Sequence, residues 1–325
     1  MPYLALASEL SADPHERTKI LSFRLVFAVL GVVVSVGVAQ PIVQALGGGP
    51  DAWRVMALVL GGLALVSMLT TPLGLRGRVA PDASGGLSGG WGAGLRAAWH
   101  NKAYLVLVVT QFIQSTAMAC GYTVVAFLFI YVVGKINLLL PFILLMAMGT
   151  FASQPLWVAM SRRLGKAATF VTATAGWAVV TVSWFWVQPG GEPFMTLPMV
   201  GTLGTQEALV ILRGIGIGVT NGGFVLMIFA MLTDAINEGK KTDANVDEGL
   251  LSGIFTAVEK LGFACGPLIA GVTLSLSGFQ SSVSGITQQS PEAVRGIVLA
   301  FSAVPATLVV ASIVFFVVAR RRTAA

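Results

Sequence analysis

The sequence predicts an all-α, polytopic membrane protein with about eight complete transmembrane helices, and composition and apolar runs support this. Hydrophobic residues make up 55% of the 325 residues and charged residues only 10%, with a mean hydropathy of +0.84. Soluble domains average about 25% charged residues. Apolar runs that reach the ~20 residues needed for a spanning helix recur along the chain. A soluble core has no room for such an apolar excess, whereas a bilayer does.

Two predicted spans precede a polar linker, and six follow it. The first two are expected at residues 21–46 and 52–75, on either side of a Gly-rich turn. The later six are expected at residues 103–133, 138–160, 167–187, 208–232, 250–276 and 294–319, with a charged loop at 234–248. The chain therefore divides into the remainder of an N-terminal bundle (1–75), a Gly/Ser-rich central cytoplasmic loop (76–102) and a C-terminal six-helix bundle (103–325).

The distribution of Lys and Arg predicts the orientation of these spans. When the first loop is placed in the cytoplasm, most cations collect on that side, including Arg17 and the arginines at 320–322. Only Arg54, Lys135 and Arg295 fall on the other side. We therefore expect a multi-pass inner-membrane protein with a cytoplasmic C-terminus.

Six helices after a central cytoplasmic loop are half of a twelve-helix transporter plan. The eight predicted spans would then be helices 5–12 of that plan. Residues 1–10 are apolar but too short to span, and we interpret them as the last turns of a fourth helix. The expectation is a chain that lacks the start of the first half, through truncation or a misplaced start.

Two adjacent ionisable residues, Glu259 and Lys260, fall in the middle of the predicted 250–276 span. Glu259 lies eleven positions after Glu248, roughly 16–17 Å of depth at 1.5 Å per residue. A charge at the centre of the ~30 Å hydrocarbon core costs from ~3 to more than 10 kcal/mol unless water, a partner or a solute meets it. We predict that Lys260 faces a water-filled cavity and contacts the solute.

Helical periodicity separates the two charges and adds a hydroxyl to the face of Lys260. Thr256 shares that face with small residues, whereas Glu259 lies about 100° further round the helix. We therefore expect the two charged groups to point to different places. Glu259 is either a proton- or cation-linked group or a buried partner for a Lys or Arg on another helix.

Polar side chains on other spans give further candidates. Gln111 and Tyr122 share one helical face with Gln114, and the glutamines form either interhelical hydrogen bonds or solute contacts. Asn221 lies beside many glycines, which we interpret as helix-packing positions. Arg24 either contacts the solute or extends to the cytoplasmic headgroups.

Two assignments concern structure rather than solute. Arg213 is expected to bind Glu207 or backbone carbonyls near the outer interface. The tryptophans are expected to form interfacial belts rather than sugar platforms; they are Trp157, Trp177, Trp184 and Trp186.

Several function classes find no support in the sequence. No basic run with interleaved aromatic residues is present, which argues against nucleic-acid binding. No HExxH motif, paired catalytic Asp or Ser–His set is present, which argues against an enzyme. Cys120 and Cys265 lie in apolar runs without metal-ligand spacing, so neither a metal site nor a cofactor is expected. The expected partners are a small-molecule solute, the lipid bilayer and a coupling Na⁺ or H⁺, and a monomer is favoured.

Two stretches carry a family resemblance. The first, residues 2–24, reads PYLALASELSADPHERTKILSFR. The second runs from Asp234 through Asn237 and Glu248 to Lys260. They resemble the helix four-to-five and helix ten-to-eleven segments of the glycoside–pentoside–hexuronide:cation symporters, the melibiose permease group of the major facilitator superfamily. Asn237 stands where that family has a second Asp.

The resemblance implies solute- or coupling-associated roles for Arg24, Thr256 and Lys260. The positions that it implies for a cytoplasmic gate or loop are Glu16, Arg17, Asp234 and Glu248. Leu4 stands where melibiose-type members carry a tryptophan, a departure that bears on galactoside recognition. The family's cation-site carboxylates on helix two would precede Met1.

We expect a secondary active transporter that carries a sugar, a glycoside or a similar small organic solute in symport with Na⁺ or H⁺. Two helical bundles would alternate access to a site at the membrane midplane. Two alternatives remain open: a transporter of a lipid-like or amphipathic solute, and a non-transporting membrane fragment without the cation site.

Overall fold

The computed structural model describes the following residues: 27, 31, 34, 35, 38, 39, 41–43, 45–74, 96, 98–188, 190–197, 201–242, 248–280 and 288–324. The chain divides into two units, Met1–Ser88 and Gly89–Ala325. In the first unit, helix α3 (Gly49–Gly74) matches the predicted second span. Most of the predicted first span lies outside the described residues.

The second unit is a bundle of long helices with one small hairpin. Its elements in chain order are α5 (Lys102–Phe127), the π-helical turn η1 (Leu128–Val132), the 3-10 turn η2 (Ile136–Leu138), α6 (Leu139–Ala152), α7 (Gln154–Leu164), α8 (Lys166–Val182), the 3-10 turn η3 (Ser183–Trp186), β1 (Pro193–Leu197), β2 (Gly201–Gly204), α9 (Thr205–Thr242), α10 (Glu248–Leu276), α11 (Pro291–Phe301) and α12 (Ala303–Ala324).

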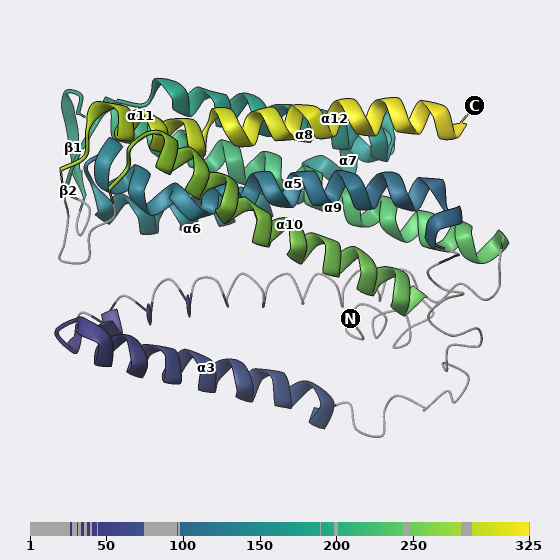
Figure 1. Cartoon of the computed structure of the whole chain (residues 1–325), viewed down its shortest axis with the longest axis horizontal. Helices are drawn as coiled ribbons and strands as arrows, with labels where there is room; N and C mark the ends of the chain where they lie inside the picture. Colours follow the sequence, from purple (N-terminus) through teal and green to yellow (C-terminus); the bar gives the residue numbers. More distant parts are fainter. Residues whose placement is uncertain are drawn as a thin grey trace. The chain divides into compact units, whose positions relative to one another are not determined.

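The predicted all-α membrane bundle is confirmed. In the described part of the chain, six helices are long and apolar enough to cross a membrane, or seven when α6 and α7 count as one bent span. Each of the six spans predicted after the linker coincides with one of these helices or with a broken pair. Figure 1 shows the antiparallel strands β1 and β2 and the start of α11 at one end of the unit, and the C-terminus of α12 at the other. We call the first of these the hairpin end.

Proline explains the two broken spans. The pair α6–α7 bends by 41° at Ser153, two residues before Pro155. The pair α11–α12 breaks at Ser302, three residues before Pro305. A proline inside a helix has no N–H to donate, and its ring clashes with the carbonyl four residues earlier. Hydropathy alone shows each pair as one continuous span.

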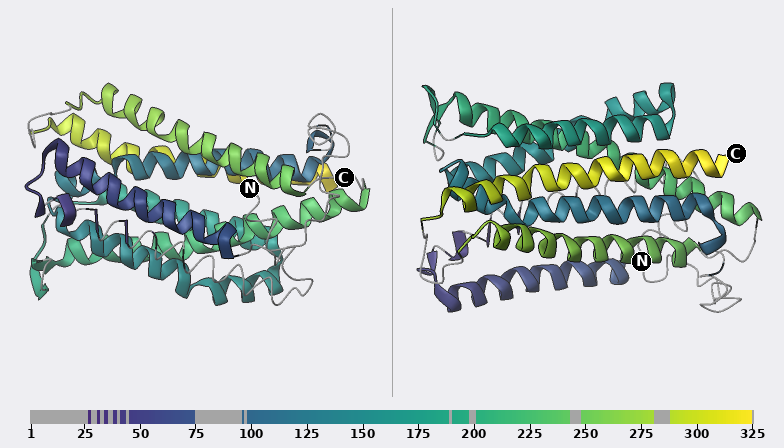
Figure 2. Two further views of the ribbon diagram at one scale, coloured as in Figure 1. Left: turned by 90° about the horizontal axis from the view of Figure 1, so that it is seen from below. Right: turned by 45° about the horizontal axis from the view of Figure 1, so that its top comes forward.

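Glycines set how closely the helices approach. Helix α10 packs on α5, while α9 packs on α6 and α8 (Figure 2). A Cβ at Gly218 of α9 would lie 1.9 Å from the Met146 carbonyl oxygen of α6. A Cβ at Gly262 of α10 would lie 2.0 Å from the Ser115 hydroxyl oxygen of α5. The prediction that the glycines beside Asn221 are packing positions is confirmed, and Gly262 plays the same part on α10.

The predicted charged loop at 234–248 is wrong over its first half. Helix α9 continues to Thr242, so Asp234 lies on a helix. Ala235 and Ile236 are 5% and 6% exposed, which shows that the helix still packs against the bundle there. These apolar contacts offset the polar character of the segment.

The belt assignment is wrong for three of the four tryptophans. Trp157, Trp177 and Trp184 are 6%, 7% and 0% exposed, and only Trp186 is exposed, at 65%. The Trp157 indole donates a 2.7 Å hydrogen bond to the Val219 carbonyl, in the glycine-rich part of α9. A tryptophan near a span end can thus fill the bundle interior. The N–H of Trp157 has an acceptor there, whereas that of Trp184 has none among the described residues.

Candidate functional site

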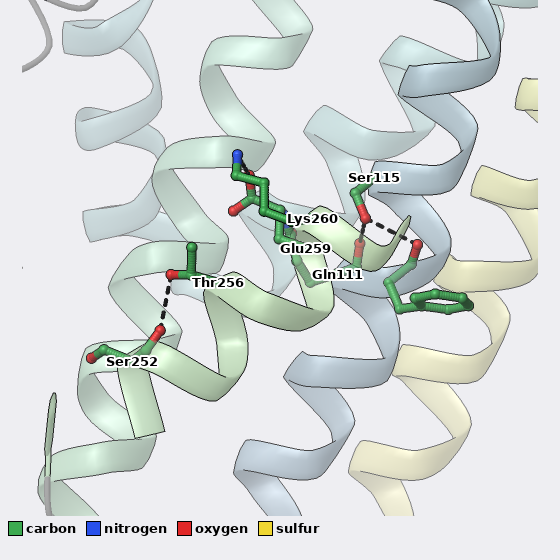
Figure 3. Close-up of polar contacts among 7 residues, drawn as sticks. Gln111, Ser115, Ser252, Thr256, Glu259 and Lys260 are labelled. Atoms are coloured by element: carbon green, nitrogen blue, oxygen red, sulfur yellow. Dashed lines mark hydrogen bonds and ion pairs between the residues drawn. The ribbon is translucent and has the colours of Figure 1, made fainter. Parts of the chain in front are cut away.

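The site begins with the amine of Lys260, in the middle of helix α10. Lys260 lies twelve residues after Glu248 and sixteen before Leu276, about 18 Å and 24 Å along the helix axis. Its side chain is 63% exposed, and its Nζ lies 3.1 Å from Oε1 of Glu259, which is 17% exposed (Figure 3). The pair thus has an accessible amine and a mostly covered carboxylate.

The expectation that these two charges point to different places is wrong. Their Cα atoms are separated by about 100° around the helix, but both side chains are long enough to span that angle. Among the described residues, the partner of Glu259 is therefore its own neighbour. This pairing lowers the cost of two charges at mid-depth, because each offsets the other.

Two aromatic rings extend the cluster from α10 to α5. The Lys260 Nζ lies 5.3 Å from the centroid of the Phe263 ring, within the range of a cation–π interaction. Phe263 stacks on Tyr122 of α5, with ring centroids 6.3 Å apart and planes 16° apart. Tyr122 is 50% exposed, so part of this aromatic surface is accessible.

Sequence reasoning missed Phe263. The signal was present, since a residue three positions after Lys260 lies on a neighbouring part of the same helical face. An aromatic residue in an apolar span, however, is common enough to pass as lipid-facing or core. Only the contact with Tyr122 on a different helix distinguishes it.

The two helices of the cluster are held together at small residues. Gly262 and Gly266 of α10 lie against α5, where a Cβ on Gly266 would be 2.4 Å from the Ala119 Cβ. The Ser115 hydroxyl donates to the Gln111 carbonyl of its own helix at 2.8 Å (Figure 3). This close approach brings the backbone of α10 to the surface of α5 at these glycines.

A proline leaves a carbonyl available near the cluster. Pro267 lies inside α10 and has no N–H, so the carbonyl of Phe263 lacks its usual partner four residues on. The Thr256 hydroxyl, one turn before Lys260, donates to the Ser252 carbonyl at 2.9 Å. Because its hydrogen is used in this bond, the Thr256 hydroxyl oxygen can only accept a hydrogen bond from a solute.

Among the described residues, no hydrogen bond joins the remaining intramembrane candidates to the charged pair. The Gln114 amide donates to the Ser312 hydroxyl of α12 at 3.2 Å, which supports the interhelical alternative for this residue. The side-chain oxygens of Gln111 and Asn221 are buried without a hydrogen-bond partner in the described part of the chain. Within that part, no hydrogen bond or ring contact joins Asn221 to Lys260.

The structure describes two of the four residues expected at a cytoplasmic gate, Asp234 and Glu248. Asp234 forms an ion pair with Lys166 at the start of α8, with 2.5 Å between the charged atoms. It also lines a cavity of about 280 Å³ together with Glu238 and Arg320. Glu248 begins helix α10. Three predicted residues lie outside the described ones: Glu16, Arg17 and Arg24.

The partners expected for Arg213 and Glu207 are wrong. Glu207 is 4% exposed and pairs with Lys135, with 2.7 Å between the charged atoms. Its other oxygen accepts from the Gly204 N–H at 2.8 Å. Arg213 instead donates to the Ser183 hydroxyl at 3.3 Å and lies over the Trp184 ring. The glutamate thus joins the start of α9 to the η1–η2 turn.

These features define a class of protein. Helices of membrane-spanning length pack closely through glycines, and a charged and aromatic cluster lies near the middle of one of them, an arrangement typical of secondary transporters. The chain belongs to the MFS/sugar transport protein family, whose model matches residues 1–320. This confirms the resemblance to the glycoside–pentoside–hexuronide:cation symporters. The family and the relatives are transporters and not enzymes.

Three curated relatives illustrate the similarity. The isoprimeverose transporter of Lactiplantibacillus pentosus is 25% identical over 312 residues, which cover 94% of this chain and 60% of that protein. The inner membrane symporter YicJ of Escherichia coli strain K12 is 21% identical over 94% of this chain and 62% of its own length. The glucuronide carrier protein homolog of the same strain is 29% identical over 48% of this chain and 30% of its own length. The chain thus spans about 60% of the length of the relatives that it matches almost throughout.

Proposed function

We propose that this chain is part of a symporter that couples the uptake of a sugar or glycoside to Na⁺ or H⁺. The observation that carries the proposal is the Lys260 amine, which is accessible at the middle of a membrane helix and lies beside a carboxylate and an aromatic pair. Ionisable residues at this depth are costly, and they mark solute and ion pathways.

The cluster has the chemistry that a sugar requires. The ammonium of Lys260 can donate to the hydroxyl and ring oxygens of a sugar, and the Glu259 carboxylate can accept from its hydroxyl groups. The stacked rings of Phe263 and Tyr122 offer an apolar surface to the C–H face of the sugar ring. A site with a few polar groups and aromatic walls is typical of small-molecule recognition.

Coupling follows from the charge balance of the pair. A proton or Na⁺ that binds the Glu259 carboxylate neutralises it and releases the Lys260 amine for the solute. The Phe263 carbonyl, which lacks an N–H donor at Pro267, offers a further oxygen ligand to Na⁺. Cation and solute would then bind in cooperation, each favouring the state that admits the other.

The family and its relatives support this solute class. The relatives are named as an isoprimeverose transporter, a glucuronide carrier homolog and a symporter. The excess of cations on one side of the predicted spans supports an inner-membrane protein with a cytoplasmic C-terminus. On this proposal Asp234 and its partner Lys166 lie at the cytoplasmic end of the bundle, where they would act in gating.

Uptake by proteoliposomes tests the proposal. The reconstituted chain should accumulate a labelled glycoside or pentoside when a Na⁺ or pH gradient is imposed, and an ionophore should abolish the accumulation. Lys260→Ala should lose it, whereas Lys102→Ala, at an exposed position at the start of α5, should keep it. Unchanged accumulation in Lys260→Ala would refute the role of this amine. Accumulation of amphipathic solutes alone would favour that solute class, and no accumulation of any solute would favour a non-transporting chain.

A further inference from the structure

A groove opens at the hairpin end of the bundle, away from the Lys260 cluster. Its volume is about 560 Å³, and it lies between η1, η3 and α11. Its lining is apolar except at two side chains, the Arg295 guanidinium and the Tyr131 hydroxyl. The apolar walls include Val132, Phe185, Val298 and Leu299.

Buried aromatic contacts fix the shape of this groove. Beneath it, Trp184 of η3 meets Phe301 of α11 edge to face, with ring centroids 5.0 Å apart. Trp184 also packs edge to face on Phe142 of α6, at 5.6 Å. Trp184 is fully buried, so its contact with Phe301 joins η3 and α11 through the interior of the bundle. The groove is therefore preformed and does not depend on an occupant to bring its walls together.

The rim of the groove continues into an exposed apolar surface. Phe185 and Leu299 line the groove and are 53% and 37% exposed. Trp186 and Val182, adjacent on η3 and α8, are 65% and 39% exposed. In a chain whose helices cross a membrane, an exposed apolar surface of this kind meets lipid acyl chains.

Arg295 is the charged residue of the groove lining. It lies near the start of α11 and is exposed. Within the described residues, its guanidinium has no hydrogen bond or ion pair, whereas the other two cations at this end are engaged: Lys135 with Glu207, and Arg213 with Ser183. Glu292, in the first turn of α11, does not line the groove.

We propose that this groove binds one anionic phospholipid from the adjoining leaflet. Its phosphate accepts hydrogen bonds from the Arg295 guanidinium and the Tyr131 hydroxyl, and one acyl chain lies along Val298, Leu299 and Phe185. A guanidinium is suited to phosphate because it presents several donors in a fixed plane.

Native mass spectrometry of the purified full chain tests this proposal. Phosphatidylglycerol, or phosphatidylcholine with the same acyl chains, is added to the protein in detergent, and the lipids that stay bound after the detergent is removed in the gas phase are counted. The wild type should retain one phosphatidylglycerol at least fivefold more strongly than phosphatidylcholine. Arg295→Gln should remove this preference, and Leu299→Trp should weaken retention of both lipids by filling the groove. Arg322→Gln changes another exposed arginine, near the end of α12, and should behave as the wild type.

Photo-crosslinking places the bound lipid independently of any variant that might lose its fold. A phosphatidylglycerol with a diazirine in its acyl chain should label Phe185, Val298 or their neighbours in the wild-type protein. Equal retention of the two lipids by the wild type, or unchanged preference in a folded Arg295→Gln variant, would overturn the proposal. Labels spread evenly over the exposed apolar surface of the helices would overturn it as well.

Discussion

Two opposite charges lie side by side in the middle of helix α10, and this arrangement lets the chain keep a cation at that depth. The Lys260 amine is 3.1 Å from the Glu259 carboxylate and 5.3 Å from the centre of the Phe263 ring. The carboxylate and the ring face both attract an ammonium group at these distances. The amine is nevertheless 63% exposed, and on the proposed function it contacts the solute.

At the residue scale, the ring of Phe263 should matter for solute affinity. Phe263→Leu keeps an apolar side chain but removes the stack on Tyr122 and the cation–π contact, which is worth about 0.5–1 kcal/mol at an exposed site. We therefore expect a two- to fivefold weaker apparent affinity, measured as the KM of gradient-driven uptake. Phe263→Tyr keeps the ring and should stay within twofold of the wild type. Equal KM values for Phe263→Leu and the wild type would exclude an aromatic contact with the solute.

At the scale of the elements, the glycines of α9 determine how the bundle packs. A Cβ at Gly218 would lie 1.9 Å from a backbone carbonyl oxygen, and backbone cannot move aside as a flexible side chain can. We expect Gly218→Ala to separate α9 from α6 and to cost about 1–3 kcal/mol of stability, as overpacking does. The melting temperature in detergent measures this loss.

Gly271→Ala is the matched control for this prediction. Gly271 lies on α10 with nothing within 4 Å of its Cβ position, so alanine should leave stability unchanged or raise it slightly. If Gly218→Ala melted at the temperature of Gly271→Ala, the close contact of α9 with α6 would not exist.

The ion pair between Lys135 and Glu207 should stabilise the hairpin end. Glu207 is 4% exposed and also accepts from the Gly204 N–H, so Glu207→Ala leaves both donors without this acceptor. We expect a loss of about 3 kcal/mol, the lower end for breaking a buried pair, because Lys135 is 35% exposed. Unfolding by titration with a denaturing detergent measures it.

A second ion pair of the same unit provides the comparison. Lys166 and Asp234 are 39% and 58% exposed, so Asp234→Ala should cost about 1 kcal/mol or less. Equal losses from Glu207→Ala and Asp234→Ala would show that burial does not strengthen the first pair.

For the molecule as a whole, the sequence was enough to predict which segments cross the membrane. Long apolar runs leave few alternatives, and the six spans after residue 102 were all placed correctly. The sequence was less informative where contacts between distant segments determine the length of a helix or the burial of a side chain. Ala235 and Ile236 extend α9 because they pack against the bundle, and Trp184 is buried because its ring fits against Phe142 and Phe301.

The candidate site was predictable to the same degree. The position of Lys260 follows from counting residues along one helix, and it lies near the middle of α10 as expected. The pairing with Glu259 and the stack between Phe263 and Tyr122 depend on side-chain directions and on helix neighbours. A helical wheel gives angles between Cα atoms, but it contains neither the reach of a long side chain nor the identity of the facing helix.

The central claim is that the position of Lys260 is reached by water and by solute from within the membrane. Its most direct test is thiol labelling of Lys260→Cys in a background with Cys120→Ala and Cys265→Ala. A membrane-impermeant thiol reagent should label this variant in proteoliposomes, and a transported sugar should slow the labelling. Labelling by a lipid-soluble reagent alone, or none by either reagent, would contradict the account.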